Sequence, residues 1–421
     1  MTVEQSTLDG MFKERYGEKG NLLPSSANSI LADKIKFASG EKIGDSYHEP
    51  VRLGGARGWT FAGSSLAGTA YALNAARSGV TKDASVQGSS FVLRETIAYD
   101  VVSRGMGGQA SFGRVFDDIV EDMNESSILA REMSLLYGQD DFGVIEAVDD
   151  SSGTNNLTLT KASTSAGLWW QMVGAAFDAY DAAGGTKQNT NALLAVTAVD
   201  LDSSGRVVVT VTGNSTDTAA LAANDVLIPL GADAEMMAGL AKVAKNTGSL
   251  YGISATTYPL WKSLSISAGS AQATVALLLR GLKANRLKSG TGKRCALVST
   301  ATWTDLNNNT AVLQRFLNSQ QKSGVEFGTE EIAVRHGKQS LEIVEHPLLK
   351  EGEAYIMDPS KHKRIGSSDH SWGIGAPGQQ ARFFRELPDS AGFELRCYWD
   401  QGHFARRPGS ITRISGIVNS V

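Results

Sequence analysis

Cysteine and long hydrophobic runs are both scarce in this 421-residue chain. Its two cysteines, Cys295 and Cys397, cannot build a disulfide framework and show no paired metal-ligand spacing, which fits a reducing compartment. The amino terminus has no signal-peptide core, and no run of about 18 apolar residues follows it. These absences exclude a disulfide-stapled or membrane-embedded chain and predict a protein that is made and kept in the cytosol.

A strong charge of either sign is also missing. The formal net charge is −4, so the chain has no general attraction for nucleic acid, and any contact with DNA should be local or passive. The hydrophobic content of 42% and the charged content of 20% lie near globular averages. The composition therefore predicts a folded protein, and the length suggests roughly two or three domains.

Motifs that carry chemistry fail when their positions are checked. GIGAPG at 373–378 has the spacing of a dinucleotide-binding loop, but Pro388 stops the helix that should follow it. DLDSSG, from Asp200, resembles the start of a calcium loop, yet Val211 stands where a glutamate is needed. None of the six histidines forms a His-x-x-x-His zinc motif. We therefore predict no catalytic, cofactor-binding or metal-binding residues.

Two segments near the amino terminus have little chance of burying their own apolar side chains. The first fifty residues mix short amphipathic pieces such as GMFKERYG with helix breakers, and they predict an arm that lies along something larger. From about 44 to 108, alternating residues are bounded by glycine, as in VRLGGARGWTF, and predict an extended hairpin. A long two-stranded excursion is only marginally stable alone, so it needs a partner surface.

Residues 111–137 carry the clearest helical pattern in the sequence. Acidic side chains fall on another face of this helix from its apolar side chains, and Gly138 stands where a glycine would end it. A helix of about 27 residues would be roughly 40 Å long and could span a subunit. The apolar side chains recur at helical spacing: Phe112, Phe116, Ile119, Met123, Ala130 and Met133.

The remainder is a mixture of strands and helices. The segment 142–231 is rich in strand and turn signals and predicts a small β module or an inserted barrel. Residues 234–285 have a helical texture, and β patterns return later. At 342–359, EIVEHPLLKEGEAYIMDP predicts a β-hairpin that brings His346 and Asp358 near one open end.

Arg57 and Trp59, in GGARGWTF, are the strongest candidates for contact with another subunit. Exposed arginine and aromatic side chains on a protruding hairpin are typical interface anchors, and a solvated loop is the alternative. The remaining candidates are cationic side chains: Arg52, Arg77, Lys82 and Arg94.

This order of elements resembles a major capsid protein of a tailed bacteriophage with the HK97-like fold. The resemblance covers nearly the whole chain and is carried by such segments as YHEPVRLGGARGWTF, SSILAREMSLLYG, SGVEFGTEEIAVRHG and VEHPLLKEGEAYIMDP. It implies an α+β fold with an N-terminal arm (1–43), an E-loop hairpin (44–108), a P-domain spine helix (109–141), a β-rich segment that would hold an inserted barrel (142–235), an A-domain (236–340) and a return to P-domain strands (341–421).

The resemblance also implies a function. Such a subunit would self-assemble into hexamers and pentamers of an icosahedral shell around phage double-stranded DNA. It would be assembled in the bacterial host cytoplasm and located in the virion capsid, with possible scaffolding, portal and decoration proteins as partners and no membrane contact. Two alternatives stay open: an encapsulin-like shell that encloses cargo proteins, and an oligomeric cytosolic hydrolase with dispersed catalytic residues, for instance His346 with Asp358.

Overall fold

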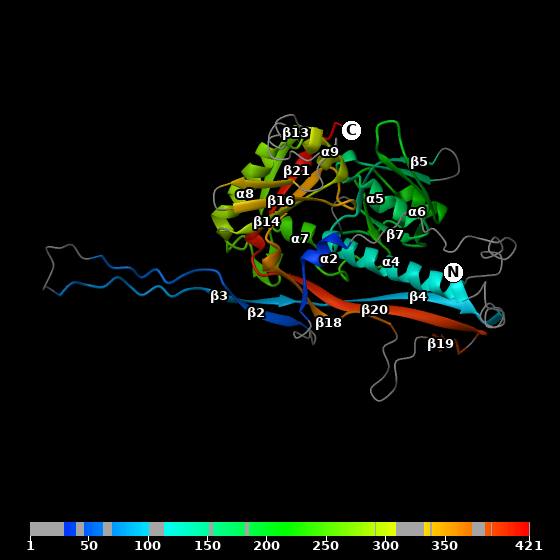
Figure 1. Cartoon of the computed structure of the whole chain (residues 1–421), viewed down its shortest axis with the longest axis horizontal. Helices are drawn as coiled ribbons and strands as arrows, with labels where there is room; N and C mark the ends of the chain where they lie inside the picture. Colours follow the sequence, from blue (N-terminus) through cyan, green and yellow to red (C-terminus); the bar gives the residue numbers. More distant parts are fainter. Residues whose placement is uncertain are drawn as a thin grey trace, which may run out of the picture.

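The computed structural model describes residues 29–38, 46–61, 70–100, 113–150, 155–181, 185–290, 292–308, 332–336, 339–372, 384–388 and 390–420. Figure 1 shows an elongated molecule. A long sheet and a helix form its base, two lobes lie side by side above them, and a two-stranded hairpin projects from one end.

The base sheet is built on one long strand, β20 (Gly392–Ala405). Strand β4 (Ser89–Ala98) pairs with one edge of β20. Two strands share the other edge of β20. β18 (His362–Trp372) pairs with residues 397–405 of β20, and β19 (Phe384–Glu386) pairs with residues 393–395, and all of these pairings are antiparallel. The short strand β1 (Phe37–Ala38) adds to β18 in parallel. The base sheet thus joins strands from the beginning and the end of the chain.

The predicted long helix is confirmed as α4 (Gly113–Tyr137), which lies against the base sheet. Its Met123 packs with Ile97 of β4 and Leu395 of β20 in one buried cluster. Because β4 pairs with β20 along its whole length, that strand belongs to the base sheet. The projecting hairpin is therefore shorter than the predicted range 44–108.

The end of α4 differs in detail from the prediction. The left-handed backbone conformation falls on Gln139, with a φ of 59°, and not on Gly138. Glycine is required at 138 for another reason, since a Cβ there would collide with the carbonyl oxygen of Met237. The segment before α7 (Leu240–Ala244) therefore packs directly on the last turn of α4.

One of the two lobes is a closed antiparallel barrel in the strand order β10-β5-β6-β9-β8-β7. Its interior holds valines that alternate along β9 together with Trp169 and Phe177, whose ring centroids are 5.0 Å apart. The barrel comprises β5 (Gly143–Asp149), β6 (Asn155–Leu159), β7 (Ala176–Tyr180), β8 (Leu194–Leu201), β9 (Val207–Thr212) and β10 (Val226–Pro229), with the short helices η2 (Lys161–Ser163), α5 (Ala166–Trp169), η3 (Trp170–Met172) and α6 (Ser215–Ala220).

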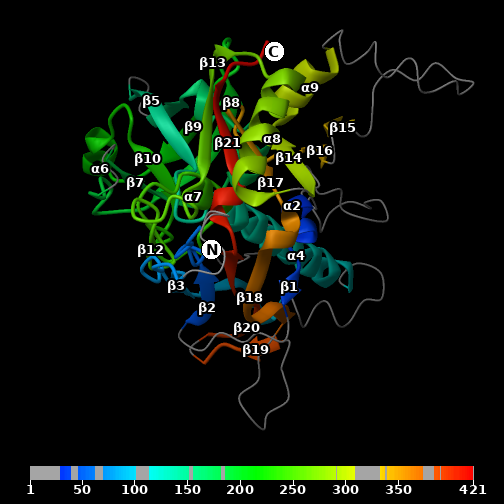
Figure 2. The same ribbon diagram turned by 90° about the vertical axis from the view of Figure 1, so that its left-hand side faces the viewer.

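The other lobe is a six-stranded mixed sheet in the order β13-β21-β17-β14-β16-β15. Figure 2 shows this lobe beside the barrel, with the base strands below both. The strands are β13 (Leu264–Ala271), β14 (Lys293–Val298), β15 (Ile332–His336), β16 (Gln339–Glu345), β17 (Glu353–Met357) and β21 (Thr412–Ile417). The helices of this lobe are α8 (Val275–Ser289) and α9 (Thr300–Asn308). The short strands β11 (Ser249–Leu250) and β12 (Ile253–Ser254) pair with each other and lie next to β3.

The central strands of this sheet are buried on both faces. In β14, Ala296 packs in the cluster that contains Leu278 and Leu282 of α8, whereas Leu297 packs in the cluster that contains the barrel core. Strands of this kind are apolar without alternation. The predicted boundary at 340 and 341 falls inside β16, so strands from both predicted regions share one sheet.

The predicted hairpin at 342–359 is wrong because β14 lies between its two strands. β16 pairs with β14 in parallel, and β17 pairs with β14 antiparallel. His346 consequently lies beyond the Val298 end of β14, where its backbone N–H donates to the Val298 carbonyl oxygen at 2.8 Å. Asp358 follows β17 at the opposite end of β14, beside Arg294. The suggested catalytic pair of His346 with Asp358 is therefore also wrong.

The projecting hairpin begins with β2 (Tyr47–Arg52) and β3 (Thr81–Val86), which pair antiparallel. Beyond these strands the two arms of the hairpin continue outward side by side, since the backbone N–H of Arg57 donates to the carbonyl oxygen of Arg77 at 3.0 Å. At the root, Val86 packs in a buried cluster with Trp261 and Phe404 of the body. The prediction of an extended hairpin is confirmed for the described residues.

Candidate assembly surface

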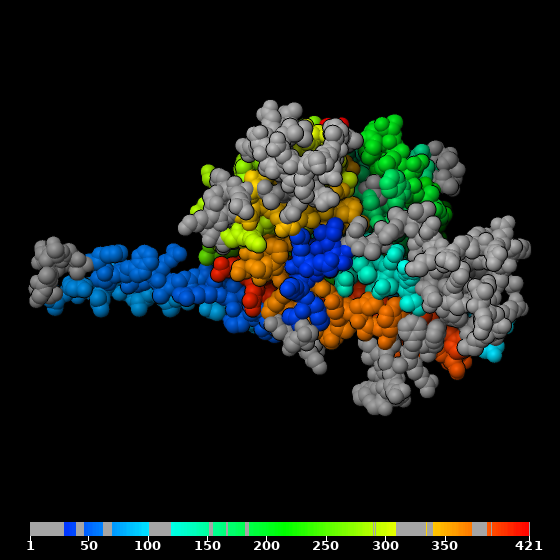
Figure 3. All heavy atoms as spheres, in the orientation of Figure 1, coloured from blue at the N-terminus to red at the C-terminus, as the bar shows by residue number. Residues whose placement is uncertain are grey.

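The outer part of the hairpin exposes large apolar side chains. We call residues 54–61 and 70–80 the distal hairpin. Exposure reaches 66% at Trp59, 88% at Phe61, 49% at Tyr71 and 78% at Leu73. Asn74 joins the two arms of the hairpin here, because its Nδ2 donates to the Trp59 carbonyl oxygen at 2.7 Å. Figure 3 shows the hairpin standing clear of the body, so the described body does not cover these side chains.

Beyond Glu49 of β2 and Asp83 of β3, the charge on the hairpin is of one sign. Between Pro50 and Lys82 the sequence has no aspartate or glutamate. The same stretch has four cationic residues, all of them exposed and divided between the two arms of the hairpin: Arg52, Arg57, Arg77 and Lys82. The structure thus brings five of the six predicted contact residues, these four and Trp59, onto one projecting element. A partner surface that matches it would be apolar with acidic residues around it.

Arg94, the sixth predicted contact residue, lies elsewhere. It belongs to β4, where its Nε forms an ion pair with the Glu394 carboxylate of β20 at 3.0 Å. Glu394 is buried and also accepts a hydrogen bond from Arg396. Arg94 is therefore held in its own sheet by an ion pair, and it does not share the surface of the hairpin.

Sequence reasoning missed Phe61, Tyr71 and Leu73 as contact candidates. Their one signal in the sequence is that they stand among glycine, alanine and serine residues, which are too small to cover them. The pattern predicted strands, but these residues lie in extended segments outside β2 and β3, and only the projecting geometry shows that their side chains are left exposed.

The root of the predicted N-terminal arm is docked on the body of its own subunit. Helix α2 (Ile30–Lys34) has its first N–H groups aimed at Glu132, a buried residue of α4. The Glu132 carboxylate accepts from the backbone N–H of Leu31 and, at 3.0 Å, from that of Ala32. It also accepts from Nε2 of the buried His346 at 2.9 Å. The rest of the predicted arm, 1–28 and 39–43, lies outside the described residues.

Arg364 of β18 satisfies the other end of α2. Its Nε donates to the Ile35 carbonyl oxygen at 2.8 Å, and its guanidinium also pairs with Asp369. A carboxylate at the first turn and a guanidinium at the last turn match the helix dipole and satisfy its free backbone groups. We call Glu132, His346 and Arg364 the arm clamp, because together they hold helix α2, at the root of the predicted arm, against α4 and β18.

Buried ion pairs also join the segment after the C-terminal end of α4 to Lys350, between β16 and β17, and to Lys245, which follows α7. Nζ of Lys350 donates to the Asp141 carboxylate at 2.7 Å, and Nζ of Lys245 lies 2.7 Å from the Asp140 carboxylate. Burial and the neighbouring Asp141 raise the pKa of Asp140 to about 6. The junction at the C-terminal end of α4 is therefore a network of opposite charges, whereas among the described residues no ion pair joins the distal hairpin to the body.

A stacked histidine pair lies where the base sheet meets the body. Nδ1 of His403 donates to the Ala238 carbonyl oxygen at 2.9 Å, so its Nε2 accepts from Nδ1 of His362, also at 2.9 Å. Burial lowers the pKa of His403 to about 4, and nearby Arg364 adds to this shift. Burial and then His403 lower the pKa of His362 well below its ordinary value. Both rings are therefore neutral at pH 7.

This histidine pair should make the subunit sensitive to acid. Because the folded pKa values lie below about 6.5, the unfolded chain binds more protons, and stability present above pH 6.5 is lost as pH falls toward 4. We expect a loss of roughly 1 to 3 kcal/mol from this pair. Thermal unfolding between pH 7.5 and 4.5 measures it, with His403→Gln as the comparison. A variant whose pH dependence matches that of the unchanged chain would contradict this assignment.

The described residues form neither a metal-binding cluster nor a membrane-spanning helix. Within the described ranges, no group of three or more histidine, cysteine, aspartate or glutamate side chains could hold a metal ion. In the same part of the chain, no helix is long and apolar enough to cross a membrane. The surface chemistry of the hairpin is thus the strongest candidate for function in the described structure.

Comparisons with known proteins agree with this geometry at the level of fold. No protein family matches the sequence, and no curated protein is similar to it by sequence. A chain of the cyanophage A-1(L) capsid asymmetric unit aligns with a TM-score of 0.50 at 13% identity, covering 96% of this chain and 95% of that one. The capsid structure of cyanophage P-SCSP1u aligns with a TM-score of 0.46 at 10% identity, covering 98% and 95% of the two chains.

A chain of the holo-SrpI encapsulin complex from Synechococcus elongatus PCC 7942 also aligns. Its TM-score is 0.44 at 7% identity, and the alignment covers 100% of this chain and 98% of that one. The fold is therefore a mixed α+β fold shared with a cyanophage capsid chain over nearly its full length, and the predicted capsid fold is confirmed.

Proposed function

We propose that this chain is the major capsid subunit of a tailed bacteriophage. In this proposal it self-assembles into hexamers and pentamers of an icosahedral shell that encloses double-stranded DNA. The observation that carries the proposal is the distal hairpin, which exposes Trp59, Phe61 and Leu73 on an excursion outside its own body, in a chain with a capsid fold. Side chains of this size gain burial from neighbouring subunits.

The shape of the molecule supports repeated contacts of one kind. The basic hairpin lies at one end of the long axis, and the outer half of α4 lies toward the other (Figure 1). Glu121 and Asp122 of α4 are exposed there and carry the opposite charge. A contact between unlike surfaces of successive copies is heterologous, and it forms closed rings, as in hexamers and pentamers, when the rotation between copies closes. We infer that the hairpin lies over the α4 region of the next copy.

In this proposal the elements take the following roles. The hairpin of β2 and β3 is the E-loop, and α4 with the base sheet forms the P-domain. The six-stranded sheet with α7, α8 and α9 is the A-domain. The closed barrel is an insertion between the spine helix and the A-domain.

The expected surroundings of the subunit are part of the proposal. The shell would be assembled in the host cytoplasm and would become the virion capsid. Scaffolding, portal and decoration proteins are the predicted partners, and the net charge of −4 favours passive contact with packaged DNA. An encapsulin-like shell shares the fold and is distinguished by its contents, protein cargo instead of DNA.

Assembly should depend on the charge of the hairpin more than folding does. We expect Arg57→Glu to lower the yield of shells by about 10-fold, because it places a negative charge where the hairpin meets an acidic surface. The melting temperature should hardly change, since Arg57 is exposed. Sedimentation of assembled particles measures the yield, and Arg286→Glu on the exposed side of α8 is the matched control. Equal yields from the two variants would remove Arg57 as an anchor.

A further inference from the structure

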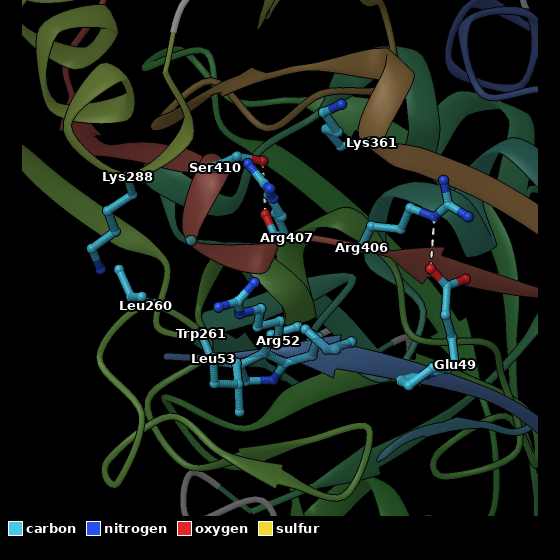
Figure 4. A pocket seen from close by; sticks show the side chains of 13 residues that line it. Glu49, Arg52, Leu53, Leu260, Trp261, Lys288, Lys361, Arg406, Arg407 and Ser410 are labelled. Atoms are coloured by element: carbon cyan, nitrogen blue, oxygen red, sulfur yellow. Dashed lines mark hydrogen bonds and ion pairs between the residues drawn. The ribbon is translucent and has the colours of Figure 1, made fainter. Parts of the chain in front are cut away.

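A cleft of about 480 Å³ opens at the root of the hairpin, between β2 and the body (Figure 4). Its lining comes from β2, from α8, from the single-turn helices η4 (Pro359–Lys361) and η5 (Pro408–Ser410), and from the segment that follows β20. Five of its side chains are cationic and one is acidic: Arg52, Lys288, Lys361, Arg406, Arg407 and Glu49.

Glu49, the one acidic residue of the lining, already has three partners within its own subunit. Glu49 accepts from Nε of Arg406 at 2.8 Å and from the Tyr47 hydroxyl at 2.9 Å, and Nζ of Lys363 lies 3.0 Å away. Burial acts to raise the pKa of Glu49, but the hydrogen bonds from Lys363 and Tyr47 hold it below its ordinary value. Glu49 is therefore ionised, and its charge is taken up by Arg406 and Lys363.

The other four cationic side chains of the lining form no ion pair with a carboxylate of the described residues. Nζ of Lys288 donates to the carbonyl oxygens of Pro259 at 2.9 Å and Lys262 at 2.6 Å, which are neutral groups. Burial lowers the pKa of Lys288, and the charge of Lys262 adds to this shift, as expected in a positive potential. Among the described residues, no carboxylate forms an ion pair with Lys361 or Arg407.

We propose that this cleft receives carboxylate side chains of a second copy of the chain. The inference rests on the proposed function, because the second copy is a neighbour in the shell. Acidic side chains outnumber basic ones in the whole chain, and exposed carboxylates such as Glu121 and Asp122 are available on another copy. Phosphate groups of nucleic acid are the weaker candidate, since the net charge of −4 gives no general attraction for them.

Occupation of the cleft would couple assembly to the direction of the hairpin. Arg52 comes from the hairpin, whereas Lys288, Lys361 and Arg407 come from the body. A carboxylate bound between them bridges the two parts by charge-assisted hydrogen bonds. This bridge would add to the packing of Val86 and the ion pairs of Glu49, which already hold the hairpin root on the body.

Carbodiimide crosslinking of assembled shells tests this directly. The reagent joins a lysine amine to a touching carboxylate as an amide, and shells made from mixed unlabelled and ¹⁵N-labelled chains distinguish links between copies. We expect Lys361 or Lys288 to be joined to an aspartate or glutamate of a different copy. Lys283, exposed on α8 outside the cleft, is the matched control and should form no such link.

Acetylation of the lysines separates the remaining outcomes. We expect Lys361 to be protected in shells, with or without DNA, relative to the unassembled chain. Protection only in DNA-filled shells would assign the cleft to phosphate groups and overturn the proposal. Shells that form while Lys361 stays as reactive as in the free chain overturn this inference alone. If no shell forms under any condition, the proposed function fails and this inference fails with it.

A neutralising double variant adds a functional readout. Lys361→Gln with Arg407→Gln should leave the melting temperature unchanged, since neither side chain is buried, and should lower shell yield by about 10-fold. Lys283→Gln is the control for removal of a lysine charge. Unchanged shell yield in the double variant would contradict a bridging role for the cleft.

Discussion

Glu132→Ala should lower the free energy of unfolding by about 3 to 5 kcal/mol. The carboxylate is fully buried and accepts from the backbone N–H groups of Leu31 and Ala32 and from Nε2 of His346. Alanine would leave three buried donors without a partner and would open a cavity between α2 and α4. Denaturant unfolding of the unassembled chain measures the loss.

Two further variants of α4 make this result specific. Glu121→Ala changes an exposed glutamate of the same helix and should stay within about 0.5 kcal/mol of the unchanged chain. Glu132→Gln keeps one acceptor oxygen and should fall between the two alanine variants. Hydrogen exchange at 29–38 should rise in Glu132→Ala, because the clamp no longer holds α2. A loss from Glu132→Ala no larger than that from Glu121→Ala would show that the arm clamp does not stabilise the fold.

The double variant Trp59→Ala with Phe61→Ala should raise the protein concentration needed for assembly by roughly 100-fold or more. Large aromatic anchors contribute about 2 kcal/mol or more each when an interface buries them, and about 1.4 kcal/mol corresponds to tenfold in affinity. The fold should be unaffected, since both side chains are exposed in the subunit. Light scattering against protein concentration measures assembly.

The control for this variant is an apolar truncation elsewhere. Leu287 of α8 is 82% exposed, comparable to Leu73 of the distal hairpin, but it lies on the body. Leu287→Ala should leave the assembly concentration unchanged, whereas Leu73→Ala should raise it. Equal behaviour of the two leucine variants, together with normal assembly of the aromatic double variant, would rule out the distal hairpin as the contact surface.

The sequence predicted those parts of the fold whose signals are local. The spine helix was found because its apolar residues keep a helical period over many turns, and the hairpin because alternation is bounded by glycine. Arg57 and Trp59 were also found from a local signal, since an arginine and an aromatic residue stand two positions apart in a glycine-rich segment.

Parts that depend on distant neighbours were not predicted. EIVEHPLLKEGEAYIMDP contains two strands, but alternation says which face a residue takes and not which strand lies beside it, so β14 could not be placed between them. Glu132 and His346 of the arm clamp are separated by 214 positions and meet only in the folded chain. The basic cleft, likewise, unites β2 with residues near the carboxyl end.

Negative-stain electron microscopy of the purified chain tests the central claim most directly. The chain should be imaged alone and with any scaffolding protein encoded beside it, over a range of concentration and salt. Closed icosahedral shells, or rings of five and six subunits, are the predicted result. A single elongated monomer under all of these conditions would contradict the account.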